Sequence, residues 1–173
     1  MNCKKETTNT KCCLIMGLIL FIIFIIAICM VGMQSKSNIL SIIAINGDNS
    51  EIGTTSIRFS KNEIEEGNAL SHVQGSDEIL INENGIYQIS YQLYGLSKSL
   101  NTFNFNAVLV VNNTALENTF NESPILRQNT ENRMTLSGTV FLRLNAGDIL
   151  KLQAVTIEDI NYPRARMDIE KIA

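Results

Sequence analysis

The chain divides into one long apolar run and a longer part in which apolar and polar positions alternate. Residues 12–33 carry no charge and are dominated by Ile, Leu and Phe. Beyond this run, apolar residues often recur at every second position, which is typical of β-strands with one buried face. The clearest example is the segment 86–94, whose large residues on one side are Tyr87, Ile89, Tyr91 and Leu93.

The apolar run 12–33 predicts a transmembrane helix. At about 1.5 Å per residue it would span roughly 33 Å, which matches a hydrocarbon core of about 30 Å. A cleaved signal peptide is the alternative, but its apolar core is normally only about 7–15 residues long. Lys4, Lys5 and Lys11 precede the run, so the positive-inside rule places the N-terminus in the cytoplasm.

This topology predicts the organisation of the whole chain. Residues 1–11 form a cytoplasmic tail, 12–33 a single-pass signal anchor, 34–54 a stalk or linker, and 55–173 an extracellular domain at the cell membrane. The extracellular part contains no cysteine, since all four precede it. Its stability must therefore come from its own core or from oligomerisation, without disulfides. The four cysteines are Cys3, Cys12, Cys13 and Cys29.

The extracellular part is predicted to hold eight or nine short strands and no helix. Turn sequences separate the strands roughly every 8–15 residues, a pattern of all-β sandwiches and jelly rolls. The polar segment 60–78 is expected to be a long connection that contains a little irregular strand. Two hairpins are expected, 79–82 with 86–94 around Asn84-Gly85, and 135–144 with 149–157 around a turn that ends in Gly147-Asp148. The other predicted strands are 57–59, 103–111, 115–120 and 165–172.

Several of these strands carry motifs beyond simple alternation. Gly85 to Tyr91 reads Gly-Ile-Tyr-Gln-Ile-Ser-Tyr, and 136–144 is followed by a turn that ends in Gly147-Asp148. Together with the last strand, 165–172, they resemble the tumour necrosis factor-like superfamily, in particular the complement-type globular head and its bacterial relatives. Residues 67–72, Gly-Asn-Ala-Leu-Ser-His, resemble a segment of collagen-like spore-surface glycoproteins.

The resemblance covers roughly residues 55–173 and implies a jelly roll that assembles as a homotrimer. In that family, aromatic and apolar side chains of an inner sheet pack along the three-fold axis. Tyr87, Tyr91 and Phe141 are therefore candidates for packing in the core or at the axis, and simple filling of a monomer core is the alternative. The signal anchor, the strand pattern and the lack of a recognisable set of catalytic residues together predict a surface protein that binds an unknown protein or glycan, or assembles a surface layer, and is not an enzyme.

The residue chemistry agrees with a binding protein. The net charge of −3 provides no basic field for nucleic acid. His72 is the only histidine; it is expected in a polar loop or at a sheet edge, because no nucleophile motif or zinc-ligand cluster accompanies it. The triplets that begin at Asn112 and Asn121 fit the N-glycosylation pattern.

Pairs of acidic residues leave other hypotheses open. The three pairs, Glu65-Glu66, Asp77-Glu78 and Glu158-Asp159, lie in polar segments. No cofactor is expected, and calcium is the alternative, because loop carboxylates with nearby carbonyl groups suit it. Two carboxylates also serve glycoside hydrolysis, so an exported carbohydrate-active hydrolase is the rival function. A structural component of a spore or virion coat is the third hypothesis.

Overall fold

The structure, a computed structural model, describes residues 18–19, 21–25, 37–45, 49–50, 53–99, 105–119, 121–122, 130–156 and 160–173. The chain forms two compact units, Met1–Lys36 and Ser37–Ala173. In the first unit, residues 18–19 and 21–25 are helical, with exposed side chains. No helix among the described residues combines the length and the apolar character needed to cross a membrane. The predicted tail and most of the predicted anchor lie outside the described residues.

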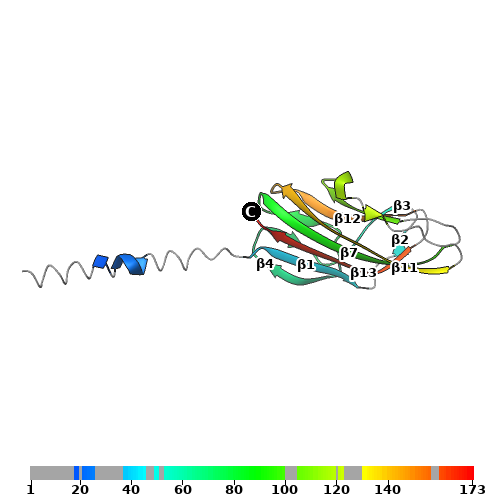
Figure 1. The fold of residues 1–173 in the computed structure, drawn as a ribbon, viewed down its shortest axis with the longest axis horizontal. Coiled ribbons are helices and arrows are strands. Elements are labelled where there is room, and N and C mark those ends of the chain that lie inside the picture. The colour runs from blue at the N-terminus through cyan, green and yellow to red at the C-terminus, as the bar shows by residue number, and fades with distance from the viewer. Residues whose placement is uncertain are drawn as a thin grey trace, which may run out of the picture. The chain divides into compact units, whose positions relative to one another are not determined.

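The second unit is a sandwich of two antiparallel sheets, as the alternating pattern predicts (Figure 1). Sheet A has the order β11 (Thr130–Leu144), β7 (Gly85–Ser99), β13 (Ile160–Lys171), β1 (Ile39–Ile45) and β4 (Lys61–Glu66), with β2 (Asn49–Ser50) beside β13. Sheet B has the order β10 (Asn121–Glu122), β8 (Phe105–Val111), β12 (Ile149–Thr156), β6 (Ile79–Ile81) and β5 (Leu70–His72). β3 (Gly53–Ser56) pairs with β12, β9 (Thr114–Ala115) pairs with β8, and the 3-10 turn η1 (Glu117–Thr119) follows β9.

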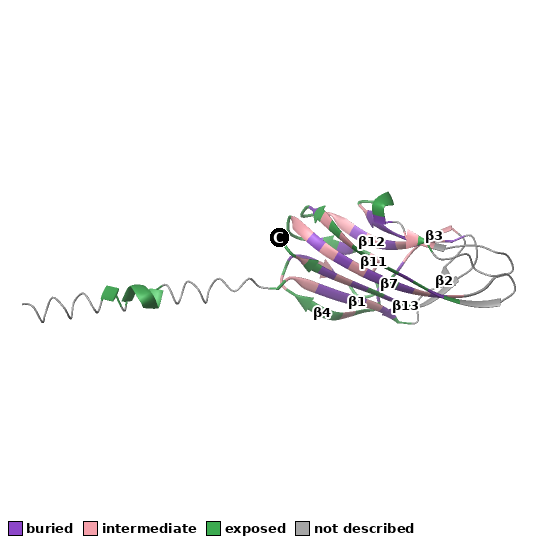
Figure 2. Ribbon diagram, viewed as in Figure 1, coloured by how far each residue is buried: buried purple, intermediate pink, exposed green. Residues whose placement is uncertain are grey.

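The hydrophobic core lies between the two sheets and is built from alternate residues of their strands (Figure 2). The strand β7 places four large side chains in it, each at most 4% exposed, which confirms the predicted half-buried strand. Burying one such side chain contributes about 1.5–3 kcal/mol. All described core residues belong to Ser37–Ala173, so this unit contains a complete core of its own. The four side chains from β7 are Tyr87, Ile89, Tyr91 and Leu93.

The two predicted hairpins are wrong because the strands on either side of each turn belong to different sheets. β6 pairs with β5 and β12 in sheet B, whereas β7 pairs with β11 and β13 in sheet A. The second turn likewise leads from β11 in sheet A to β12 in sheet B. The turns at Asn84-Gly85 and Gly147-Asp148 are therefore corners between the sheets.

Two further predictions near the start of the sandwich need correction. The segment 60–78, predicted as a connection with a little irregular strand, contains the two sheet strands β4 and β5, and the predicted linker 34–54 contains β1. β4 is an edge strand of sheet A, where polar and charged side chains are compatible with strand structure. β1 pairs with β13 and β4 inside sheet A, so the sandwich begins near Ser37.

The segment 57–59, predicted as a strand, is not part of either sheet, although its backbone is held in place. Ile57 N–H donates to the carbonyl of Leu152 at 2.9 Å, and Phe59 N–H donates to that of Ser76 at 3.0 Å. Both side chains are buried in the core. The apolar alternation there reflects burial between the sheets, without a strand.

The strands β7 and β11 extend beyond their predicted ends. The predicted strands end at residue 94 and begin at residue 135, but β7 continues to Ser99 and β11 begins at Thr130. These two polar extensions pair with each other, Thr130 opposite Ser99. Backbone pairing with the neighbouring strand holds these polar extensions in the sheet. The sequence did not predict them because they lack alternating apolar residues.

Candidate functional site

The outer side of sheet A, which is directed away from the core, carries rows of polar residues, exposed apolar side chains and two hollows. We call this surface the sheet-A face. Residues directly opposite each other in paired strands share one face. The register therefore places hydroxyl and charged residues side by side across the middle strands. One row contains Thr139, Ser90, Asp168 and Ser41, and the next contains Ser137, Gln92, Arg166 and Ile43.

Large apolar side chains are exposed around these polar rows. Among the described residues of the second unit, six large hydrophobic side chains are classed as exposed, and four of them lie on the sheet-A face. Val73 and Leu80 are the other two. The sheet-A face is therefore the candidate interaction surface of the described domain. The four are Phe141 (63% exposed), Ile45 (50%), Ile172 (48%) and Ile64 (44%).

Two hollows lie on this face and share Gln92 and Arg166. One, of about 420 Å³, is lined by residues of both polar rows. The other, of about 470 Å³, lies toward the end of β1 and is lined by apolar residues such as Ile43 and Ile45, with Tyr94 and Arg164. The sheet-A face therefore carries a polar depression next to a mixed one.

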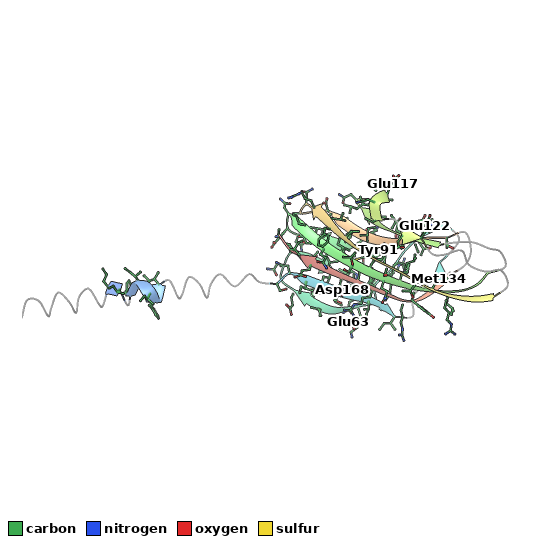
Figure 3. All side chains as sticks on the ribbon, viewed as in Figure 1. Glu63, Tyr91, Glu117, Glu122, Met134 and Asp168 are labelled. Atoms are coloured by element: carbon green, nitrogen blue, oxygen red, sulfur yellow. The ribbon has the colours of Figure 1, made fainter. Side chains whose placement is uncertain are left out.

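Arg166, which lines both hollows, is the centre of a network of charged and polar side chains. Arg166 Nε donates to Asp168 Oδ2 at 2.8 Å, its Nη1 to Glu63 Oε2 at 3.2 Å, and its Nη2 to Ser41 Oγ at 3.1 Å. The Ser41 hydroxyl donates to Asp168 Oδ1 at 2.5 Å and is itself buried, 1% exposed. Figure 3 labels Glu63 and Asp168, the two carboxylates that Arg166 joins.

This network changes the proton affinity of its members. Burial would raise the pKa of Asp168, but hydrogen bonds from Arg166 and Ser41, together with the charge of Arg166, outweigh burial and hold that pKa below its usual value of 3.8. The hydrogen bond to Asp168 and the charges of Asp168 and Glu63 raise the pKa of Arg166. Both side chains therefore stay charged at neutral pH.

The structure separates the three aromatic residues that the motifs singled out. Tyr87 is fully buried and donates its hydroxyl to the carbonyl of Glu83 at 2.6 Å. Tyr91 is 4% exposed and donates to the carbonyl of Thr119 at 3.1 Å. Burial raises the pKa of both phenols. The two tyrosines fill the core of the single chain, whereas Phe141 lies on the sheet-A face.

The backbone geometry explains why glycine occupies two positions of the family motifs, Gly85 and Gly147. A Cβ at Gly85 would lie 2.5 Å from the carbonyl oxygen of Ala173, so only glycine lets the C-terminus approach β7. Gly147 has a positive φ of 94°, which suits glycine.

Asp148, next to Gly147, fixes the corner between the sheets. Its carboxylate accepts hydrogen bonds from the backbone N–H of Asn145 and the side chain of Asn112, both at 2.7 Å. These hydrogen bonds lower its pKa. Its contacts are those of a turn cap.

The segment 67–72 also has a structural role. Gly67 has a φ of 83°, and the Asn38 side chain accepts the N–H groups of Asn68 and Ala69 at 3.1 and 3.2 Å. His72 is buried on β5, an edge strand of sheet B, as expected for a sheet-edge histidine. Its ring nitrogens lie 2.6 Å from Asn62 Oδ1 and 3.1 Å from the Ser76 carbonyl. Among the described residues, no group of three or more His, Cys, Asp or Glu side chains could hold a metal ion.

The acidic pair that motivated the hydrolase hypothesis is engaged in ion pairs. Asp77 and Glu78 lie 3.4 and 2.8 Å from Lys151 Nζ. The other pair, Glu158-Asp159, lies outside the described residues.

The asparagines of the two glycosylation triplets make hydrogen bonds within the fold. Asn112 donates to Asp148 and accepts the N–H of Ile149 at 2.9 Å. Asn121 donates to the carbonyl of Ser137 at 2.5 Å. Both side chains therefore help to hold turns and strands together.

Sequence reasoning missed Arg166, Asp168 and Ser41. The alternation of charged residues with Ala165, Met167 and Ile169 along β13 could have predicted a polar outer face. Ser41 is 127 residues from Asp168 in the chain, so no local pattern links the two.

Comparison with known proteins supports the fold. Searches of protein families and of curated proteins find no match. Among solved structures, murine APRIL at pH 5.0 is similar at a TM-score of 0.60 with 17% identity, covering 80% of this chain and 100% of that one. The globular domain of zebrafish complement 1qA is similar at a TM-score of 0.57 with 11% identity, covering 79% of this chain and 98% of that one. The chain thus has a jelly-roll fold of the tumour necrosis factor and complement type.

Proposed function

We propose that this chain is a non-catalytic surface protein, anchored in a membrane by residues 12–33, whose outer domain assembles as a homotrimer through the sheet-A face. The trimer presents its loops to a protein or glycan partner or builds a surface layer. The resemblance of residues 67–72 to spore-surface glycoproteins motivates a bacterial cell surface as its location.

The observation that carries the proposal is the concentration of exposed apolar side chains on the sheet-A face. Phe141, Ile45, Ile64 and Ile172 lie there, whereas the two motif tyrosines lie inside the sandwich. An apolar surface of this kind is stabilised when another molecule covers it. The similarity to a complement globular domain supports two further copies of this chain as the covering molecules.

The position of the chain ends supports anchoring at one end of the sandwich. The N–H of Lys171 donates to the carbonyl of Asn38 at 3.0 Å, so the first residue before β1 lies beside the C-terminal strand (Figure 1). An anchor before residue 37 therefore enters at this end.

Cross-linking of the full-length chain in membranes tests this proposal. We expect a cross-linked ladder that stops at the trimer, in a membrane fraction that alkaline carbonate does not extract. A ladder that stays at the monomer contradicts the trimer. Release of the chain by carbonate contradicts the anchor.

The rival functions predict other results. A hydrolase would cleave glycans in a substrate screen and would lose activity in Asp77→Asn or Glu158→Gln. The ion pairs of Asp77 and Glu78 with Lys151 favour a structural role for the first pair. A coat component would be recovered with purified spores or virions and not with membranes. The absence of a cofactor stays a prediction with calcium as its alternative, and thermal unfolding with and without the ion tests it.

A further inference from the structure

Resting on the proposed trimer, we infer that Arg166 and Asp168 act as one unit in the sheet-A face: copies of this chain associate when the two opposite charges are present together or absent together, and not when one charge is present without the other. The pair lies in the middle of the face, and the exposed apolar residues lie around it. Removing either charge alone is therefore expected to prevent association, and removing both is expected to permit it.

Arg166 and Asp168 lie on β13, in the middle of the sheet-A face. Asp168 lies opposite Ser90 on β7 and Ser41 on β1, and Arg166 lies opposite Gln92 and Ile43. Both residues line the polar hollow of about 420 Å³. A second copy that covers Phe141 on β11 and Ile45 on β1 also covers the strands between them.

In a single chain, the Arg166–Asp168 pair is partly exposed to water. The side chains of Arg166 and Asp168 are 47% and 41% exposed, so water still solvates them in the free chain. An exposed ion pair of this kind contributes little to the stability of a monomer. Single substitutions are therefore expected to leave the folded monomer largely intact.

Association of two copies through the sheet-A face would bury the Arg166–Asp168 pair. Covering the face removes water from both charges, which is costly for each charge alone. The existing hydrogen bonds compensate, because Arg166 already donates to Asp168, Ser41 and Glu63 and Asp168 already accepts from Arg166 and Ser41. Glu63 is a second carboxylate partner of Arg166, so removal of Asp168 leaves Arg166 without a carboxylate partner only when Glu63 is also neutral, as in Glu63→Gln. In that background, an unpaired charge in the covered face has no such compensation.

The consequence is a strongly non-additive pattern. Removing one member of a buried ion pair is far more damaging than replacing both by apolar residues of similar size. In the Glu63→Gln background, we expect Asp168→Leu or Arg166→Met to weaken association by about a hundred-fold or more, and the double change to return association to within about ten-fold of the Glu63→Gln chain.

The experiment measures association of the natural chain and of Glu63→Gln, and then of both single changes and the double change at Arg166 and Asp168 in the Glu63→Gln background. Cross-linking of the full-length chain in detergent is combined with sedimentation of residues 37–173, which contain all the described core residues. Glu78→Gln is the matched control, because it breaks the ion pair with Lys151 outside the sheet-A face. It should associate like the natural chain, and circular dichroism should show all variants folded.

The outcomes separate this inference from the proposed function. A natural chain that is monomeric at all concentrations overturns both. A trimeric natural chain whose single variants associate equally well overturns the specificity role and leaves the trimer standing. A double variant that associates more weakly than either single variant also overturns it, because the charges would then act independently.

Discussion

The ring of Tyr91 lies directly over Gly138, its partner on β11. A Cβ at position 138 would come within 2.7 Å of the ring carbon and hydroxyl of Tyr91. Tyr91 is buried and its hydroxyl is hydrogen-bonded to Thr119, so the ring cannot easily move. Glycine at this place in the second family motif is therefore required by an aromatic residue of the first.

This contact predicts that Gly138→Ala destabilises the domain. Overpacking beside a buried ring typically costs about 1–3 kcal/mol, measured by urea unfolding of residues 37–173. Tyr91→Leu in the Gly138→Ala background should recover part of the loss. The neighbouring exposed change Ser137→Ala should alter stability by less than about 0.5 kcal/mol. Equal stability of Gly138→Ala and the natural sequence would show that the ring is free to move.

Asp148 predicts a pH-dependent contribution to stability. Its pKa is lowered in the folded chain, so its contribution is complete above its ordinary pKa of about 3.8 and disappears as the pH falls below it. Asp148→Ala should cost about 1 kcal/mol at pH 7. The difference from the natural sequence should shrink in unfolding experiments below about pH 3.8. A difference that stays constant down to pH 2 would mean that Asp148 acts through packing. Glu66→Gln, an exposed acidic change on β4, serves as the control.

Phe141 predicts a separation between folding and association. Its side chain is 63% exposed, so Phe141→Ser should change the stability of the monomer by less than about 0.5 kcal/mol. The same change should weaken association by at least about ten-fold, because a large apolar contact is lost. Val73→Ser is the matched control, since Val73 is 76% exposed and lies in the turn after β5. Equal weakening by both changes would place the interface elsewhere.

Asp168 predicts that the assembly dissociates in acid. Its pKa lies below 3.8 in the single chain, so the pair with Arg166 stays intact from neutral pH down to about pH 4. Below that range, protonation of Asp168 leaves Arg166 without its main partner. Light scattering against pH should therefore show loss of the trimer only below about pH 4, at a pH where circular dichroism still reports strands. Dissociation between pH 5 and 7 would identify a different titrating group.

The sequence predicted what depends on local periodicity. The alternation around Tyr87 and Leu93 correctly gave a half-buried strand, and the turn sequences correctly marked both corners. The partners of the strands could not be predicted, because Asn84-Gly85 and Gly147-Asp148 connect two sheets although such turns often join hairpins. Pairing between sheets depends on contacts distant in the chain.

The residues of the sheet-A face were even harder to predict from the sequence than the pairing of the strands. The motif marked Phe141, but alternation along β11 did not decide which side faces the core, because Val140 and Leu142 are also apolar. The network of Arg166 depends on Ser41 and Glu63, which are 125 and 103 residues away. Such a cluster is a property of the folded sheet.

The mass of residues 37–173 in solution tests the central claim most directly. Sedimentation equilibrium over a range of micromolar concentrations should fit a monomer–trimer equilibrium, with the trimer dominant at the highest concentration. Phe141→Ser should shift that equilibrium toward the monomer. A natural sequence that remains monomeric at every concentration, or that forms only dimers, would contradict the account.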